Sequence, residues 1–215
     1  VVPSGAGAWF EGGPGYYPSF PTFGPVGPVR LRDTRSGGAT YDHLFQGIGQ
    51  RAAGSTFELQ VAGRGGVDSA AIAAVLNVTV TGAAGSGFVT VYPCGTALPN
   101  ASNINFTAGI TIPNSVIATI GVDGKVCIFT SAATQLLADV SGFFPPSTGY
   151  EPLVPARLMD SRFPGSATVD GMYSNMGIRP AGSTMELPVT DRGNVPSDAV
   201  TVVVNVTVAG AQSTG

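Results

Sequence analysis

The chain repeats itself at a fixed spacing, and this repeat limits what it can fold into. The segment Ala53–Val61 (AGSTFELQV) returns as Ala181–Val189 (AGSTMELPV), and Leu76–Val80 (LNVTV) returns at the same spacing as Val204–Val208 (VNVTV). Upstream, RLRDTR at 30–35 returns as RLMDSR at 157–162, a spacing that is shorter by one position. Self-similarity of this kind is the signature of a tandem array. The 215 residues are therefore expected to hold modules of roughly 115 to 128 residues instead of one large domain.

The region 29–146 has the pattern of β structure throughout. Its runs rich in Val, Ile, Thr and Phe are separated by Gly-rich turns, and several alternate apolar and polar residues as half-buried strands do. The sequence therefore predicts an all-β fold of antiparallel β-sandwich modules, with Greek-key or jelly-roll order left open and a closed barrel as the alternative. The expected strands are 29–34, 56–62, 72–81, 88–93, 103–107, 115–120, 126–130 and 136–144.

Three other segments flank this module. Residues 1–28 form an N-terminal arm in which Gly and Pro supply almost half of the positions, so the arm has no core of its own. Residues 147–152 form a short linker, and residues 153–215 match only the first half of the module. Half a sandwich exposes an apolar face and unpaired strand edges. We expect either a longer natural chain or strands from another chain to complete it.

The arm is unusually aromatic for a linker. Disordered segments are poor in aromatic residues, and each ring carries apolar area that water disfavours. One interpretation is a linker from a preceding domain. The other is an arm that orders against its own module or a neighbouring subunit, and its assembly candidates are Trp9, Phe10, Tyr16, Tyr17, Phe20 and Phe23.

Two cysteines, Cys94 and Cys127, fall in the same module, one at the end of a strand-like run and one at the start of another. The sequence predicts a disulfide between them, which implies export, and the alternative is a pair of buried reduced thiols. No His or third Cys lies nearby, so no metal or other cofactor is expected. The first residue is Val1, which fits a mature secreted chain or a piece of a longer one. No apolar run reaches the length of a membrane span.

Charge is scarce, and the charges that recur are informative. Only 11% of the residues are charged and the net charge is −3, which leaves no basic surface for nucleic acid. We expect the recurring charges to form structural ion pairs that pin strand ends and loops. The alternatives are a sugar-binding site and a hydrolase with paired carboxylates at Asp33 and Glu58. The recurring residues are Asp33 with Asp160, Arg35 with Arg162, Glu58 with Glu186, and Arg64 with Arg192.

Several stretches together resemble a repeat module that occurs in tandem in large secreted bacterial proteins. The resemblance covers 29–145 and 153–215 and leaves the arm outside. It implies non-catalytic extracellular units for surface display, often beside other domains, and it supplies no catalytic residues. The matching stretches are Arg30–Arg35, Ala53–Leu59, Val61–Gly65, Leu76–Gly82, Gly87–Pro93, Asn100–Asn103 and Asp139–Phe144.

No catalytic motif is apparent, and the only histidine is His43, in a loop-like stretch. The chain is therefore expected not to be an enzyme. The leading hypothesis is an extracellular structural or surface protein, acting as a spacer, adhesin stalk or filament subunit. Its partners would be further copies of itself in head-to-tail contact, or other surface proteins. The alternative is a glycan- or cell-wall-binding module that presents Tyr41, Tyr92 and Tyr173.

Overall fold

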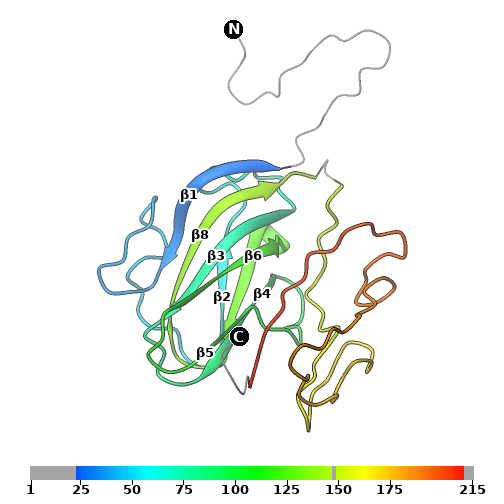
Figure 1. The fold of residues 1–215 in the computed structure, drawn as a ribbon. Helices are drawn as coiled ribbons and strands as arrows, with labels where there is room; N and C mark the ends of the chain where they lie inside the picture. Colours follow the sequence, from blue (N-terminus) through cyan, green and yellow to red (C-terminus); the bar gives the residue numbers. More distant parts are fainter. Residues whose placement is uncertain (1–22, 147–148, 211–215) are drawn as a thin grey trace, which may run out of the picture. The chain divides into compact units, whose positions relative to one another are not determined.

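The computed structural model describes residues 23–146 and 149–210. The chain divides into two units, Val1–Val154 and Pro155–Gly215. The described part of the first unit holds eight strands and one short 3-10 helix, η1, and most of the strands are labelled in Figure 1. The strands are β1 Gly24–Asp33, β2 Ser55–Gln60, β3 Ala73–Thr81, β4 Gly87–Pro93, β5 Ile104–Phe106, β6 Ile112–Thr119, β7 Lys125–Thr130 and β8 Gln135–Phe144, and η1 is Val122–Gly124.

The strands form two antiparallel four-stranded sheets, in the orders β1-β8-β3-β6 and β2-β7-β4-β5. The first strand pairs with the last, β2 with β7, β3 with β6, and β4 with β5. This is the pairing of one long hairpin that has been rolled into two facing sheets, which is the jelly-roll arrangement. The predicted all-β sandwich is confirmed, and of the two strand orders left open by the sequence the structure has the jelly roll.

The core lies between the two sheets because each strand turns alternate residues inward. On β3, Leu76, Val78 and Val80 are fully buried, while the residues between them are only partly buried. The inward residues of β4 and β7 belong to the same cluster. Full burial of one such side chain contributes about 1.5–3 kcal/mol, so this alternation is the main source of the module's stability.

Strand β1 begins at Gly24, inside the range that the sequence analysis assigned to the arm. The prolines of 24–28 argued against a strand there. They are tolerated because β1 is an edge strand, where a missing backbone donor faces no neighbour on one side. The register with β8 is irregular between Pro25 and Val29, as in a β-bulge.

Phe23, one of the six assembly candidates, packs on its own module. Its ring meets that of Phe144 edge-on, with the centroids 5.3 Å apart. It also covers Gly142, where a Cβ would lie 2.1 Å from the Phe23 Cζ, so this approach requires glycine at 142. The other five candidates, Trp9, Phe10, Tyr16, Tyr17 and Phe20, lie outside the described residues.

The second unit keeps the loop conformations of the first but not its strands. Within 155–210 the structure has no strand and one isolated bridge, between Asp160 and Ser174, which matches the bridge between Asp33 and Gln46. Backbone angles with positive φ recur at equivalent positions of the two copies, for example 59° at Phe45 and 54° at Tyr173. In the described part of the first unit, β1, β2 and β3 pair only with β6, β7 and β8. Residues 153–215 contain no counterpart of those three partner strands.

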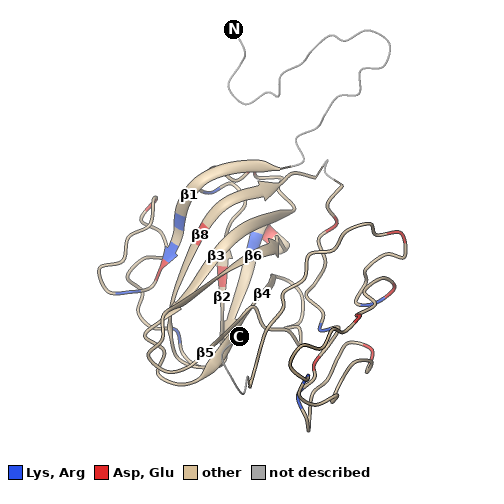
Figure 2. Cartoon of the chain, in the orientation of Figure 1, with Lys and Arg blue, Asp and Glu red and all other residues tan. Residues whose placement is uncertain are grey.

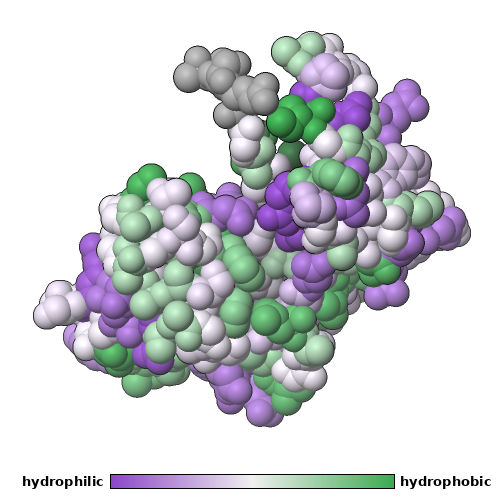
Figure 3. All heavy atoms as spheres, turned by 90° about the horizontal axis from the view of Figure 1, so that it is seen from below, coloured by the Kyte–Doolittle hydropathy of each residue, from purple (hydrophilic) through white to green (hydrophobic). Residues whose placement is uncertain are grey.

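The surface reflects the composition. Charged residues are sparse along the ribbon in Figure 2, and pale or green residues cover much of the face drawn in Figure 3. Among the described residues, no helix has the length and apolarity that crossing a bilayer requires.

Candidate functional site

The first charged network lies where β1 ends. The carboxylate of Asp33 is almost fully buried and accepts two hydrogen bonds from the Arg35 guanidinium, at 2.9 and 2.6 Å. Arg30 donates to the same carboxylate through Nη1 at 3.0 Å. Its Nε and Nη2 donate hydrogen bonds to the carboxylate of Asp139 on β8, at 2.6 and 3.1 Å. Arg30 therefore joins the end of β1 to the neighbouring strand.

The same network recurs in the second unit. Asp160 accepts hydrogen bonds from Arg162 at 2.9 and 2.5 Å and from Arg157 at 2.8 Å. The bonds from Arg162 lower the pKa of the Asp160 carboxyl to about 2, although burial acts to raise it. Hydrogen bonds from Arg35 likewise hold the pKa of Asp33 below its ordinary value. Both carboxylates therefore stabilise the fold above their ordinary pKa, and each contribution is lost as the pH falls through the lowered pKa, which for Asp160 is about 2.

The second network is built around Arg64, which is 7% exposed. Its Nε and Nη2 donate to the Asp42 carboxylate at 2.9 and 2.8 Å. Nη1 donates to the carbonyl of Gln60 at 2.8 Å and Nη2 to that of Leu31 at 3.3 Å. One side chain therefore holds together the 40–45 turn, the end of β2 and a carbonyl of β1. Burial is the largest effect on the pKa of Asp42 and acts to raise it, but the hydrogen bonds from Arg64 and from the Leu44 amide, together with the charge of Arg64, outweigh it, so the pKa lies below its ordinary value.

Arg192 repeats this network at the equivalent position of the second copy. It donates to Asp170 at 2.6 and 3.0 Å, to the carbonyl of Pro188 at 2.8 Å and to that of Leu158 at 2.7 Å. The hydrogen bonds from Arg192 lower the pKa of Asp170 to about 2. An aromatic ring also accompanies each arginine, since Arg64 lies 5.0 Å from the Phe45 centroid and Arg192 5.0 Å from that of Tyr173. We call these networks the ion-pair frame. In the first unit the frame consists of Arg30, Asp33, Arg35 and Asp139 with Asp42 and Arg64. In the second unit it consists of Arg157, Asp160 and Arg162 with Asp170 and Arg192.

Sequence reasoning identified half of this frame. The carboxylates that bind Arg64 and Arg192 are Asp42 and Asp170, and neither was a candidate. The two aspartates are as far apart in the sequence as the two arginines, and this equal spacing was the signal that could have found them. Arg30 and Arg157 were likewise missed, although both lie inside the recurring motif.

Glu58 and Glu186 are not part of the frame. Glu58 is exposed on β2 and pairs with Lys125 of β7 at 2.9 Å. Glu186 is also exposed. The position that the repeat would make equivalent to Lys125 lies beyond residue 215, so the given sequence holds no equivalent of this pair.

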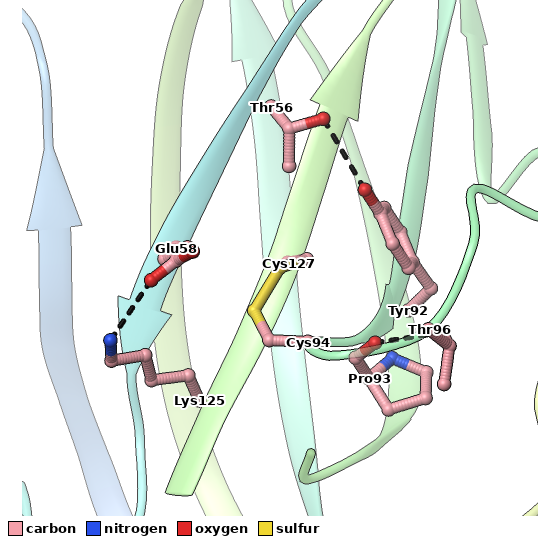
Figure 4. Close-up of a disulfide and its surroundings, with 8 residues drawn as sticks. All are labelled: Thr56, Glu58, Tyr92, Pro93, Cys94, Thr96, Lys125 and Cys127. Carbon is pink, nitrogen blue, oxygen red and sulfur yellow. Dashed lines mark hydrogen bonds and ion pairs between the residues drawn. A yellow bond between two sulfur atoms is a disulfide. The ribbon is translucent and has the colours of Figure 1, made fainter. Parts of the chain in front are cut away.

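The predicted disulfide is confirmed. Cys94 and Cys127 are bonded, and they join the end of β4 to β7 (Figure 4). Val126 and Ile128 point into the core, so the alternation of β7 places Cys127 on the outer face of its sheet. There the two cysteines form a small buried cluster with Tyr92, against which Phe129 packs.

The three tyrosines proposed for glycan contact lie in different surroundings. Tyr92 is only 6% exposed, and its hydroxyl bonds that of Thr56 at 3.3 Å, so its assignment as an exposed platform was wrong. It is covered because it belongs to the cluster around the disulfide. Tyr41 is half exposed, and its hydroxyl accepts a hydrogen bond from the amide of Gly65 at 2.9 Å. Tyr173 is partly buried beside Arg192.

Arg32 is a buried cation that no sequence pattern indicated. Its side chain is fully buried, and none of its guanidinium nitrogens has a hydrogen-bond partner among the described residues. The guanidinium lies on the face of Phe57, 3.2 Å from the ring centroid. Burial lowers the pKa of Arg32 to about 9, and the charge of Arg51 adds to this effect. The guanidinium is therefore still protonated at neutral pH, at a cost to stability.

Replacing Arg32 with methionine, the residue at the matching position 159, is expected to raise the free energy of unfolding by about 1 to 4 kcal/mol. The gain comes from removing a poorly compensated buried cation, and loss of the cation–π contact opposes it. Urea denaturation followed by circular dichroism measures the difference.

The pH dependence of this difference is a further check. The folded-state pKa of Arg32 is lowered from 12.5 to about 9, so between these values the unfolded state binds more protons. The natural chain is therefore stabilised as the pH rises in this window. The advantage of Arg32→Met should therefore be constant up to about pH 9 and shrink above it, so that it is smaller at about pH 10 than at pH 7. A variant less stable than the natural chain at neutral pH would mean that the guanidinium is well compensated.

Among the described residues, no group of three or more His, Cys, Asp or Glu side chains is placed to hold a metal ion. His43 is exposed in a turn, with a φ of 61°. The residues that the structure brings together form two ion-pair networks and a disulfide.

The class that this architecture defines is an all-β, disulfide-linked jelly-roll sandwich. Comparison with protein-family models, with curated proteins and with solved structures finds no match to the chain.

Proposed function

We propose that the chain is a non-catalytic extracellular structural protein, an array of jelly-roll modules that serves as a spacer, stalk or filament subunit. The observation that carries this proposal is the ion-pair frame. In a chain with so few charges, the recurring Asp and Arg residues bond one another and backbone carbonyls. Such contacts are suited to holding loops in place, and they occupy the groups that a sugar or a substrate would need.

Residues 155–210 are, on this proposal, the first half of a second jelly-roll module. The supporting evidence is that backbone angles and both ion-pair networks match at the positions that the sequence repeat makes equivalent. The disulfide supports an extracellular location, because such bonds persist in oxidising compartments. Association between copies in head-to-tail contact would generate an open-ended array.

Sedimentation velocity and negative-stain imaging test the proposal. The full chain is expected to form larger assemblies as its concentration rises. Deleting residues 1–22 removes most of the aromatic arm and leaves β1 intact. This variant therefore tests whether the arm makes the contact between copies, and it does so without disturbing the first module. Unchanged assembly would assign the contact to the second unit. A chain that stays monomeric at every concentration and binds polysaccharides on a glycan array would overturn the proposal in favour of a glycan-binding module.

A further inference from the structure

We propose that one end of the sheet β1-β8-β3-β6 in the first module is a docking surface for the segment with which the next module opens, residues 150–153. Tyr150 is the anchor of this segment, and Phe144 of β8 is the ring that receives it. The inference rests on the proposed function, since it takes the second copy of the repeat to be the next module of an array.

Tyr150 opens the second copy of the repeat. Each copy has an aromatic residue followed by two prolines, at the same distances upstream of the recurring RLxDxR motif. These residues are Phe23, Pro25 and Pro28 in the first copy, and Tyr150, Pro152 and Pro155 in the second. By its contacts, however, the chain up to Val154 belongs to the first unit. The opening segment of one copy is therefore packed on the copy that precedes it.

Phe144 contacts two opening aromatic residues at once. Tyr150 stacks on its ring, with the centroids 4.4 Å apart and an angle of 24° between the planes. Phe23 meets the same ring edge-on, with the centroids 5.3 Å apart and an angle of 63°. Stacked and edge-on arrangements are both favourable for aromatic pairs, so Phe144 can hold the opening aromatic of its own module and that of the next. Burial raises the pKa of the Tyr150 phenol, which agrees with a ring withdrawn from water.

A second contact holds the other end of the segment. The hydroxyl of Thr119, at the end of β6, donates to the carbonyl of Leu153 at 3.1 Å. Phe144 and Thr119 both lie opposite Ala73, one on each side of β3. They are therefore two strand spacings apart, about 10 Å, which is also about the span of three extended residues. The segment from Tyr150 to Leu153 has this length, so it crosses the end of the sheet from β8 to β6.

Ala73 is fully buried, although it faces away from the core. Its neighbour on β3, Ala74, belongs to the core between the two sheets, and successive residues of a strand point to opposite faces. Ala73 therefore lies on the outer face of its sheet, yet its exposed fraction is 0%. The opening segment, which is held by the two cross-strand neighbours of Ala73, supplies the cover.

The sequence that makes this junction recurs in the chain. GFFP at 142–145 is followed by Tyr150, and GYYP at 15–18 is followed by Phe23 at the same spacing. Residues 15–18 lie outside the described residues, and the recurrence is one of sequence. A terminal aromatic pair and an opening aromatic residue therefore occur together as a repeated unit, as expected if every junction uses the same contact.

Titration of the Tyr150 phenol tests the docking in the full chain. The method is NMR of tyrosine labelled with 13C at Cζ, and Tyr150→Phe identifies the signal. In the natural chain the pKa should lie above its ordinary value, because the ring is buried. Phe144→Leu keeps an apolar side chain but removes the stacked ring, so it should return the pKa toward the ordinary value. Phe88→Leu makes the same exchange in the other sheet and should leave the pKa of Tyr150 unchanged.

Thr119 provides a second test of the same signal. Thr119→Val keeps the shape of the side chain but removes the donor to the Leu153 carbonyl. It should also lower the pKa of Tyr150, because both contacts hold one segment. Thr119→Ser keeps a hydroxyl and should retain the raised value. This pair of variants separates docking of the whole segment from a ring contact that Tyr150 makes by itself.

Docking also predicts that a residue of the second copy supports the first module. Tyr150→Ala should lower the urea midpoint at which the NMR signals of β3 and β8 are lost, whereas Tyr173→Ala, in the second unit, should not. An ordinary Tyr150 pKa in the natural chain, no response to Thr119→Val, equal responses to Phe144→Leu and Phe88→Leu, or no effect of Tyr150→Ala would overturn the inference. Sedimentation of the natural chain reports on the proposed function separately, because modules can assemble whether or not the opening segment is docked.

Discussion

Replacing Arg64 with methionine is expected to lower the free energy of unfolding of the first unit by about 3 to 5 kcal/mol. Methionine keeps much of the side-chain volume but removes the hydrogen bonds to Asp42 and to the carbonyls of Gln60 and Leu31. The Asp42 carboxylate would then be partly buried without its cation, and the two carbonyls would lose a donor. Removing one member of such a pair costs more than the pair itself contributes, because the remaining groups stay desolvated.

The measurement is urea denaturation followed by circular dichroism, with hydrogen exchange to locate the change. Opening is expected first in the 40–45 turn, which Arg64 holds through Asp42. The matched control is Lys125→Met, which breaks the exposed pair with Glu58. Exposed pairs contribute little, so the denaturation midpoint of this variant should hardly move. Equal effects from the two substitutions would show that the Arg64 network does not hold the loops.

The strands could be predicted from the sequence because their signal is local. On β3, apolar side chains at every second position mark a strand with one face in the core, whatever its partner is. The strand order could not be predicted, because a local sequence pattern does not identify a pairing partner that is distant in the sequence. The paired strands β1 and β8, for example, lie at opposite ends of the module's sequence. The start of β1 was missed for a related reason: proline is compatible with a strand only at an edge, and edge position is a property of the whole sheet.

Of the residues in the candidate site, only some of those that recur in both copies of the repeat could be predicted from the sequence. Recurrence identified Arg64 and Arg192 as paired cations but did not give their partners, which lie in turns whose shape depends on positive φ at residues such as Phe45 and Tyr173. The residue of the second copy that is equivalent to Arg32 is Met159. Comparison of the two copies therefore predicts no shared role for a charged side chain at this position. Tyr92 was taken for a surface residue, since the sequence does not show that the outer face of β4 is covered around the disulfide.

Removing the disulfide is expected to lower the free energy of unfolding by about 3 to 4 kcal/mol in the chain-entropy estimate. The bond joins residues 33 positions apart, and the chain between them holds β5, β6 and η1. Both strands are sheet edges, and β5 is only three residues long. Each of these strands is therefore paired on one side only, and the link between β4 and β7 limits how far the segment can separate from the module when it opens.

The double variant Cys94→Ala with Cys127→Ala, compared with the natural chain in urea, measures this contribution. Hydrogen exchange should show the largest loss of protection in β5 and β6, because these edge strands depend most on the closed loop. The reduced natural chain is the matched control, because cavity effects of the alanines are absent from it. A loss equal to that of the double variant would assign the whole effect to the disulfide. Undiminished stability in both forms would mean that sheet pairing alone holds the segment and that the disulfide does not stabilise the module.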